Sequence, residues 1–281
     1  MAEPLISDEL WHNEVEPLLP KHPPDPRGGA PRKPDRPCLE GILHVLRTGT
    51  QWQRLPQCAV AQRQHLLATL HRVDQRWRLA AAAPAAVEPV GRRRRGGRGD
   101  RDRRLRQRAG KKGGAHTGPS PVDRAKKGCK RHLICAAVSG VPLLVVCTPA
   151  NVRDDVPFLA MLDMMPPVKG PGGRGAPRYK PWAIVGDAAY GHDHVIPQVV
   201  ARRVLPLLAR RAKPGRPVEH GSGLGRVRYV VERSIAWLGN FRRIDHCYER
   251  TGAAWQAFNE LACCVICANK LRQINQTKMA A

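Results

Sequence analysis

The chain has 281 residues and a formal net charge of +25, because 48 lysines and arginines face only 23 acidic residues. This imbalance is too large for a typical metabolic enzyme and favours a polyanionic partner, DNA or RNA. The length allows one large domain, or a small domain followed by a medium one. A ribosome-like structural protein and arginine accumulation in a GC-rich gene are alternatives that charge alone leaves open.

The sequence predicts neither a membrane span nor a secretory signal. No apolar run approaches the ~20 residues that a span needs, and residues 1–5 lack a basic region followed by an apolar one. The nine cysteines are an odd number without framework spacing, which is typical of a reducing compartment. We therefore expect a cytoplasmic protein with no membrane partner. We also expect Cys264 and Cys267 to be buried as small apolar residues rather than to bind zinc.

Residues 1–57 predict a small helical domain. Ser7 is a favourable N-cap, and residues 8–19 carry apolar side chains at helical spacing. Asp35 is the predicted cap of a second helix, which Gly49 ends. A DNA-binding module and a plain packing domain both fit this pattern.

Residues 58–110 differ in composition from the rest of the chain. Residues 80–86 are almost all alanine, and residues 91–108 are nearly all arginine, glycine and aspartate. A segment of this kind cannot bury enough apolar surface to fold. We therefore expect this aberrant segment to be disordered.

An α/β pattern follows in residues 111–274. Residues 133–138 and 141–148 predict a β-hairpin. Further helices and apolar strands are predicted in alternation: helices at 155–164, 195–203, 226–238 and 255–271, and strands at 183–186 and 204–209. This succession indicates a sheet with helices packed on it.

Two carboxylates stand out in this part of the chain. Asp187 directly follows the apolar strand 183–186, so its side chain lies where it can coordinate a ligand. Glu232 lies in a basic, helix-forming stretch, where an ion pair with an arginine is the ordinary interpretation. In so basic a chain, the two also fit oxygen ligands for a divalent metal that acts on a phosphate backbone.

The segment His192-Asp193-His194 has the residue types of a metal site. His192 and His194 would share one face of a strand. We favour a structural role for this segment over a metal site, and a supporting role for the nearby Asp154.

Several sequence blocks occur together in a characteristic order. They are EPLLP at 16–20, GILHVLRTGTQWQRLP at 41–56, HTGPSPVDR at 116–124, ANVRD at 150–154 and VVER at 230–233. Over residues 6–56 and 111–271, their order and spacing resemble bacterial insertion-sequence transposases of the DDE type, in the IS-five superfamily. Each block alone is modest, but the series is specific.

The resemblance implies a ribonuclease-H-like mixed sheet with flanking helices, preceded by the small helical domain. In this family two aspartates and one glutamate hold Mg²⁺, for which Mn²⁺ can substitute. Asp187 matches the second acidic residue of the triad and Glu232 matches the third. Arg228, one helical turn before Glu232, resembles a DNA-contacting arginine. Arg233, Arg242 and Arg243 are our further candidates for phosphate contacts.

The resemblance also implies the partners and the reaction. We predict a DNA transposase that binds the terminal inverted repeats of an insertion sequence as a homodimer and catalyses Mg²⁺-dependent cleavage and strand transfer of double-stranded DNA. A non-catalytic DNA-binding remnant of such a transposase is the alternative. A structural RNA-binding protein is a third interpretation, which the ordered sequence blocks disfavour.

The first aspartate of the triad has no match in its expected context. The family places it on a strand shortly before Lys111, in a sequence such as Ile-Asp-Ala-Ser-Val. Asp102 is the nearest by position and is our candidate for this catalytic and metal-binding role, but arginines flank it. Codons for residues 102–106, read one nucleotide later, can encode Ile-Asp-Ala-Ser-Val. We therefore interpret residues 58–110 as translated out of frame and expect impaired activity.

Overall fold

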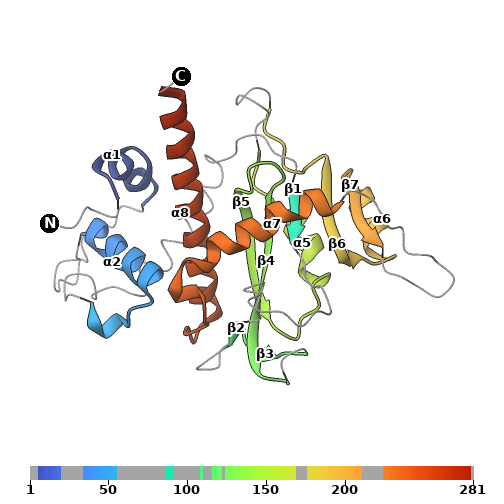
Figure 1. The fold of residues 1–281 in the computed structure, drawn as a ribbon, viewed down its shortest axis with the longest axis horizontal. Helices are drawn as coiled ribbons and strands as arrows, with labels where there is room; N and C mark the ends of the chain where they lie inside the picture. Colours follow the sequence, from blue (N-terminus) through green and yellow to red (C-terminus); the bar gives the residue numbers. More distant parts are fainter. Residues whose placement is uncertain are drawn as a thin grey trace, which may run out of the picture.

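A mixed sheet with helices on both faces forms the centre of the structure, and the N-terminal helices lie at one end of it (Figure 1). This computed structural model describes residues 6–19, 34–55, 87–90, 108–109, 116–121, 124–168, 176–210 and 224–279. Among these residues, no helix is both long enough and apolar enough to cross a membrane.

Five strands form the body of the sheet, in the order β5-β4-β1-β6-β7. They are β1 (Val87–Val90), β4 (Lys127–Ala136), β5 (Pro142–Pro149), β6 (Ala183–Gly191) and β7 (Leu205–Arg210). Strands β5, β4 and β1 are antiparallel neighbours, whereas β1, β6 and β7 run parallel. The short strands β2 (Arg108–Ala109) and β3 (Gly118–Pro119) pair with the beginning of β4.

The helices that pack on the sheet are α5 (Val156–Asp163), α6 (Val195–Ala201), α7 (Leu224–Gly239) and α8 (Gly252–Met279). They lie where the sequence predicts helices, and α7 and α8 extend beyond the predicted ends. The predicted α/β architecture is thereby confirmed.

Strand alternation divides the side chains of β4 between two cores. Leu133 and Cys135 belong to a core with α7 and α8, whereas Ile134 and Ala136 pack toward α5. Further along the sheet, Ile184 of β6 packs with α5 and α6. Helix α7 contacts β1, β4 and β6 and crosses the sheet (Figure 1). One face of the sheet is therefore covered by α7, and the opposite face by α5 and α6.

The predicted hairpin is confirmed as β4 and β5, and α7 holds its turn through two side chains. Ser234 Oγ donates a hydrogen bond to Gly140 O at 2.6 Å, and Arg233 Nη2 donates to Ser139 O at 2.9 Å. Gly140 has a φ of 72°, and a Cβ there would lie 3.0 Å from Ser234 Oγ. Because only glycine adopts this conformation readily and leaves this space, Gly140 allows α7 to approach the turn closely.

β5 is an edge strand, and α8 covers its backbone. Gln256 of α8 accepts a hydrogen bond from Cys147 N at 2.8 Å and donates one to Val145 O at 2.7 Å. A single glutamine thus satisfies two polar groups that would otherwise be exposed at the sheet edge. The cysteines of α8 are buried, as predicted, with Cys264 7% and Cys267 8% exposed.

The first helical stretch is continuous but irregular. It consists of α1 (Asp8–Leu10), a π turn η1 (Trp11–Val15) and a 3-10 turn η2 (Glu16–Leu18). Ser7 caps it as predicted, because its Oγ accepts a hydrogen bond from Leu10 N at 3.3 Å. Pro17 has no N–H to donate, which explains why the last turn is not a regular α-helix.

Helix α2 (Asp35–Thr48) has Pro34 at its N-cap position. The prediction of Asp35 as the cap is therefore wrong by one residue: Asp35 is the first helical residue, where its charge still favours the helix N-terminus. Gly49 ends α2 as predicted, with a φ of 72° and its N–H bonded to Val45 O at 2.9 Å.

Within the aberrant segment 58–110, the structure describes only β1 and β2. Both are strands of the sheet, so the expectation of disorder does not hold for these six residues. Strand β1 lies between β4 and β6, with Val87 paired to Ala136 and to Ile184. The other residues of the segment, Asp102 among them, lie outside the described part of the chain.

Buried His132 predicts a loss of stability in mild acid. Its Nε2 lies 2.8 Å from Thr148 Oγ1, and burial lowers its pKa to about 4, against an opposing effect of Asp154. The unfolded chain keeps a histidine pKa of about 6.5. As the pH falls from about 6.5 to 4, the unfolded state takes up a proton that the folded state refuses, so the free energy of unfolding decreases by roughly 3 kcal/mol.

Urea unfolding at a series of pH values measures this effect. We expect His132→Gln to remove most of the decrease, whereas His12→Gln, at an exposed histidine, should leave it unchanged. An equal pH dependence in the His132 variant and the unmodified protein contradicts the prediction.

Candidate functional site

Asp187 lies in β6 at the point where pairing with β7 becomes irregular. The two strands pair regularly from Ala183 to Gly186, and the register shifts before the next pair, at Gly191. Asp187 is 6% exposed, and its Oδ1 accepts a hydrogen bond from Ala189 N at 2.9 Å. Irregularities of this kind in a strand often re-aim side chains next to active sites. The prediction that Asp187 follows the strand is wrong, because β6 continues to Gly191 and Asp187 lies within it. The structure places a buried, oriented carboxylate where the regular pairing of β6 with β7 ends.

Strand alternation assigns Asp187 to one face of the sheet. Ile184 packs against α5 and α6, so Val185 and Asp187 alternate to the opposite face. That face is covered by α7, which contacts both β6 and β1. The carboxylate of Asp187 and the helix that carries Glu232 are consequently on the same side of the sheet.

Glu232 lies on the solvent-exposed side of α7. The buried side of the helix is formed by Val230, Val231, Ser234, Ile235 and Leu238. These residues have the helical spacing of a packed face. The side chain of Glu232 is thus kept out of the core and can meet a ligand from solvent.

Asp102, our candidate for the first acidic residue of the triad, lies outside the described residues. The central strand β1, next to β6, contains one acidic residue, Glu88, whose backbone is in register with Cys135. The structure thus places Asp187 and Glu232 on neighbouring elements and leaves the position of the first acidic residue a prediction.

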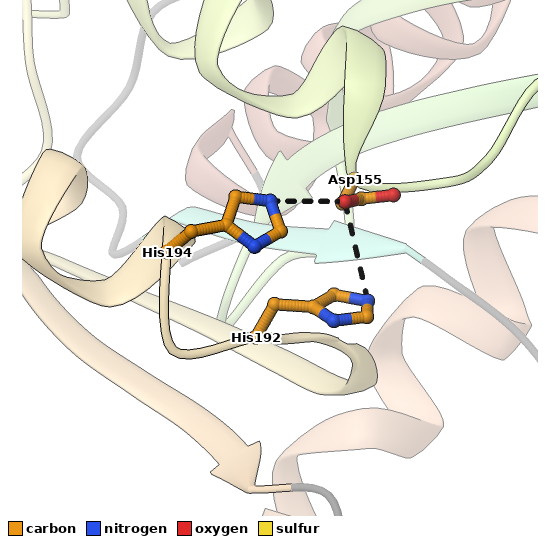
Figure 2. Close-up of side chains that lie close together, drawn as sticks. All are labelled: Asp155, His192 and His194. Atoms are coloured by element: carbon orange, nitrogen blue, oxygen red, sulfur yellow. Dashed lines mark ion pairs between the residues drawn. The ribbon is translucent and has the colours of Figure 1, made fainter.

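A second group of polar side chains consists of Asp155, His192 and His194 (Figure 2). His192 and His194 follow β6, and Asp155 precedes α5. The Nε2 atoms of His194 and His192 lie 3.2 and 4.0 Å from Asp155 Oδ2. The ligand atoms of the three residues all lie within 4.8 Å of one another, a spacing that could hold a metal ion. From the sequence we favoured a structural role for the two histidines, and Asp155 was missed because it lies in another segment.

Tyr190 connects this group electrostatically to Asp187. Its side chain is buried against Phe158, with ring centroids 4.8 Å apart. Burial raises the pKa of Tyr190 well above its usual value, and the carboxylates of Asp154, Asp187 and Asp155 raise it further. Tyr190 therefore remains a neutral hydroxyl beside these acidic groups. Asp154 is itself ion-paired with a lysine of β4, at 3.1 Å from Lys130 Nζ, which fits the supporting role that we predicted.

Two sequence families match the chain. Residues 6–83 match the family described as "Putative transposase of IS4/5 family (DUF4096)", and residues 98–268 match the family described as "Transposase DDE domain". The second match covers more than half of the chain. The chain belongs to the IS4/IS5 family of DDE transposases. The resemblance seen in the sequence blocks is thereby confirmed.

Two proteins of one Burkholderia cepacia insertion element are similar to this transposase. The first, named "Putative transposase for insertion sequence element IS402", is 40% identical over 161 residues, covering 57% of this chain and 72% of the relative. The second, an uncharacterized 16.2 kDa protein of the same element, is 51% identical over 61 residues, covering 20% of this chain and 39% of the relative. No solved structure matches the chain.

The four arginines that we predicted to contact DNA differ in their surroundings. Arg242 is exposed, three residues after the end of α7, and Arg228 lies in α7 one turn before Glu232. Arg233 instead holds the β4–β5 turn and lies 5.1 Å from the centre of the Trp237 ring. Among those of the four arginines whose side chains the structure describes, Arg242 is the exposed one.

Arg243 lies in the core of the transposase. It is 7% exposed, is ion-paired with buried Glu249, and its Nε lies 3.0 Å from Glu249 Oε1. Its guanidinium also lies 5.7 Å from the ring centres of Trp52 and Phe258. We call these four residues the Arg243 cluster. Because it is enclosed in this way, Arg243 is not positioned to meet DNA.

Proposed function

We propose that this transposase binds the terminal inverted repeats of its insertion sequence and catalyses Mg²⁺-dependent DNA cleavage and strand transfer. The observation that carries the proposal is the placement of Asp187 on the face covered by the helix of Glu232. Asp187 is a buried carboxylate of β6, at the point where the regular pairing of β6 with β7 ends. The net charge of +25 supports a DNA partner.

The donor set of this site fits Mg²⁺, or Mn²⁺ in its place. Both residues offer carboxylate oxygens, which are the ligands that hard divalent cations prefer. The N–H of Ala189 holds one oxygen of Asp187, so this carboxylate has a fixed orientation before a cation binds. Asp187, Glu232 and, by family position, Asp102 are the residues that we propose as ligands. The bound cation would stabilise charge on the attacking and leaving oxygens of the phosphodiester.

The remaining parts of the chain would hold DNA and orient it. We propose that Arg228, one helical turn before Glu232, and Arg242, beyond the end of α7, bind phosphates of the DNA. We also propose that helices α1 and α2 belong to a DNA-binding unit of residues 1–57. The mixed sheet, antiparallel on one side of β1 and parallel on the other, supports a ribonuclease-H-like core for residues 111–274. A homodimer in the DNA complex belongs to the same proposal.

We propose further that this copy is impaired, because Asp102, in the segment 58–110, lacks the sequence context that the resemblance implies for the first acidic residue. A non-catalytic protein that still occupies DNA ends is the alternative. If the segment is out of frame, the nucleotides of its gene read one position later encode an Ile-Asp-Ala-Ser-Val type sequence. A gene that encodes no such sequence in either frame contradicts this explanation.

A cleavage and strand-transfer assay on a duplex ending in the insertion sequence's own repeats tests the function. We expect repeat-specific binding in all conditions, and nicking and joining only with Mg²⁺ or Mn²⁺. If both this protein and a variant with the restored reading frame bind the repeats without cleaving them, the result supports the non-catalytic alternative. Absence of a preference for repeat ends contradicts the transposase proposal itself.

Arg242→Ala should weaken DNA binding and reduce its salt dependence. Each phosphate contact contributes about 0.9 to the slope of log K against log salt concentration, so loss of one contact lowers the slope by about 1. Arg202→Ala is the charge-matched control, because Arg202 is ion-paired with Asp163 at 2.7 Å. Fluorescence anisotropy at several salt concentrations measures both. Equal slopes for the two variants would exclude Arg242 as a phosphate contact.

A further inference from the structure

We propose that Asp155, His192 and His194 form a transition-metal site, with Zn²⁺ as the preferred ion, separate from the carboxylate site at Asp187 and Glu232. The proposal stands on the arrangement in Figure 2, where both imidazoles converge on one carboxylate. It does not depend on the DNA reaction.

The three residues come from two segments that the sheet brings together. Asp155 is the N-cap residue of α5, and His194 is the N-cap residue of α6. An ion bound by all three would therefore tie the beginning of α5 to the beginning of α6. It would also restrain the segment that follows Asp187 in the chain.

The spacing of the ligand atoms is close to that of a tetrahedral zinc site. Bonds of about 2.0–2.2 Å separate the ligand atoms of a tetrahedral ion by about 3.3–3.6 Å. The Nε2 of His194 and that of His192 lie 3.2 and 4.0 Å from Asp155 Oδ2, and no pair of ligand atoms is more than 4.8 Å apart. The imidazole rings are inclined at 37°, with centroids 5.3 Å apart. The side chain of His194 already lies at this spacing from Asp155, whereas that of His192, which is 16% exposed, would move closer by less than 1 Å.

The donor types distinguish this site from the carboxylate site. Two imidazoles and one carboxylate suit Zn²⁺, whereas Mg²⁺ prefers oxygen ligands in an octahedral arrangement. The side chain of His194 is 59% exposed and that of Asp155 is 5% exposed. The site is thus anchored in the interior and open to solvent on one side. A water molecule would supply the fourth ligand, as in zinc sites with three protein ligands.

Arg153 competes with a metal for the same carboxylate. Its Nε and Nη2 donate to Asp155 Oδ1 and Oδ2 at 3.0 and 2.8 Å. Burial alone would raise the pKa of Asp155, but these hydrogen bonds and the charge of Arg153 outweigh burial and lower it. The carboxylate is therefore ionised at neutral pH, as a ligand must be. The Arg153 side chain is 63% exposed and can leave Oδ2 when an ion binds.

Titration of the untagged, full-length protein with Co²⁺, and competition with Zn²⁺, tests the proposal. We expect one equivalent of Co²⁺ to give the intense visible absorption of a four-coordinate ion, without a sulfur charge-transfer band. Zn²⁺ should displace Co²⁺, and thermal unfolding should shift to higher temperature with Zn²⁺. Absence of a four-coordinate spectrum at millimolar Co²⁺ overturns the proposal.

One variant of a proposed ligand and three comparison variants test the assignment. His194→Ala should weaken binding by at least ~10²-fold, more than the loss of a supporting hydrogen bond to a metal ligand costs. Arg153→Ala should tighten binding, because it removes the competitor for Oδ2. His246→Ala, at a half-exposed histidine paired with Asp245, and Asp187→Asn should leave the Co²⁺ spectrum unchanged. Because His194 is exposed, His194→Ala should keep the fold, and unchanged Co²⁺ affinity in that folded variant overturns the assignment.

Discussion

Replacing Glu232 with glutamine will abolish DNA cleavage and strand transfer while leaving the free energy of unfolding nearly unchanged. The side chain is exposed on α7, outside the buried face of the helix, and exposed substitutions change stability by only about 0.5 kcal/mol. A bound metal ion supplies several kcal/mol of transition-state stabilisation. Since about 1.4 kcal/mol corresponds to a factor of ten, we expect a loss of roughly 10³-fold or more.

The measurement is the rate of strand transfer on the repeat-ended duplex, in the full chain if it is active and otherwise in the frame-restored form. Asp163→Asn, at an exposed residue of α5, is the charge-matched control and should keep full activity. Activity within tenfold of the unmodified protein in the Glu232 variant excludes a role as ligand.

Asp187 allows a more specific version of the same test. Asp187→Asn keeps the shape of the side chain and should lose activity as Glu232→Gln does. Asp187→Cys should be inactive with Mg²⁺ and partly active with Mn²⁺, because a thiolate is a poor ligand for Mg²⁺ and a better one for a softer ion. Recovery that depends on the metal indicates direct coordination. A structural role for Asp187 predicts the same loss with both metals.

The sequence predicted these two carboxylates because each has a local signal. Asp187 directly follows a run of apolar residues, and Glu232 lies in a helix at a position that matches the family. Their placement on one face of the sheet depends on the alternation of β6 and on the contact of α7 with β6 and β1. A local pattern can predict the strand and the helix, but not which face of the sheet the helix covers.

The cluster of Asp155, His192 and His194 could not be predicted in the same way. The two histidines are neighbours in sequence and were visible, but Asp155 belongs to another segment. Its approach depends on α5 and α6 packing on the same face of the sheet. The parallel pairing of β1 with β6, which fixes that packing, is a non-local property of the chain.

Arg242 and Arg243 are neighbours in the sequence, yet their surroundings differ in a way that the local sequence could not predict. Both follow Phe241 and have the same charge, so the sequence assigned both to DNA. In the structure Arg242 is exposed and Arg243 is 7% exposed. The difference arises because Trp52, Phe258 and Glu249 surround only Arg243, and these residues come from three separate segments.

Replacing Arg243 with methionine should destabilise the transposase by about 3–5 kcal/mol, since breaking a buried ion pair leaves the partner carboxylate uncompensated in the core. Glu249 is 3% exposed. The loss of cation–π contacts with the rings of Trp52 and Phe258 adds to the effect. A loss of about 3–5 kcal/mol is a large part of the stability of a typical domain. Urea unfolding, followed by tryptophan fluorescence, measures the change.

The neighbouring arginine provides the matched control. Arg242→Met removes the same charge from an exposed site and should change the free energy of unfolding by no more than about 0.5 kcal/mol. The double variant Arg243→Met, Glu249→Leu should recover much of the loss, because it leaves no unpaired buried charge. Equal effects of Arg242→Met and Arg243→Met would show that the ion pair is not buried in solution.

The position of the Arg243 cluster links this loss of stability to DNA binding. Trp52 belongs to the N-terminal region and Phe258 to α8, and their ring centroids lie 5.9 Å apart. Gly49 at the end of α2 approaches the same place, where a Cβ would lie 3.2 Å from Arg242 Cβ. Weakening the cluster should therefore release the N-terminal helices from α8 before the sheet unfolds. Hydrogen exchange of the backbone amides of α2 should then accelerate in Arg243→Met and not in Arg242→Met. Repeat-specific DNA binding should also decrease in Arg243→Met, because the proposed DNA-binding unit is released.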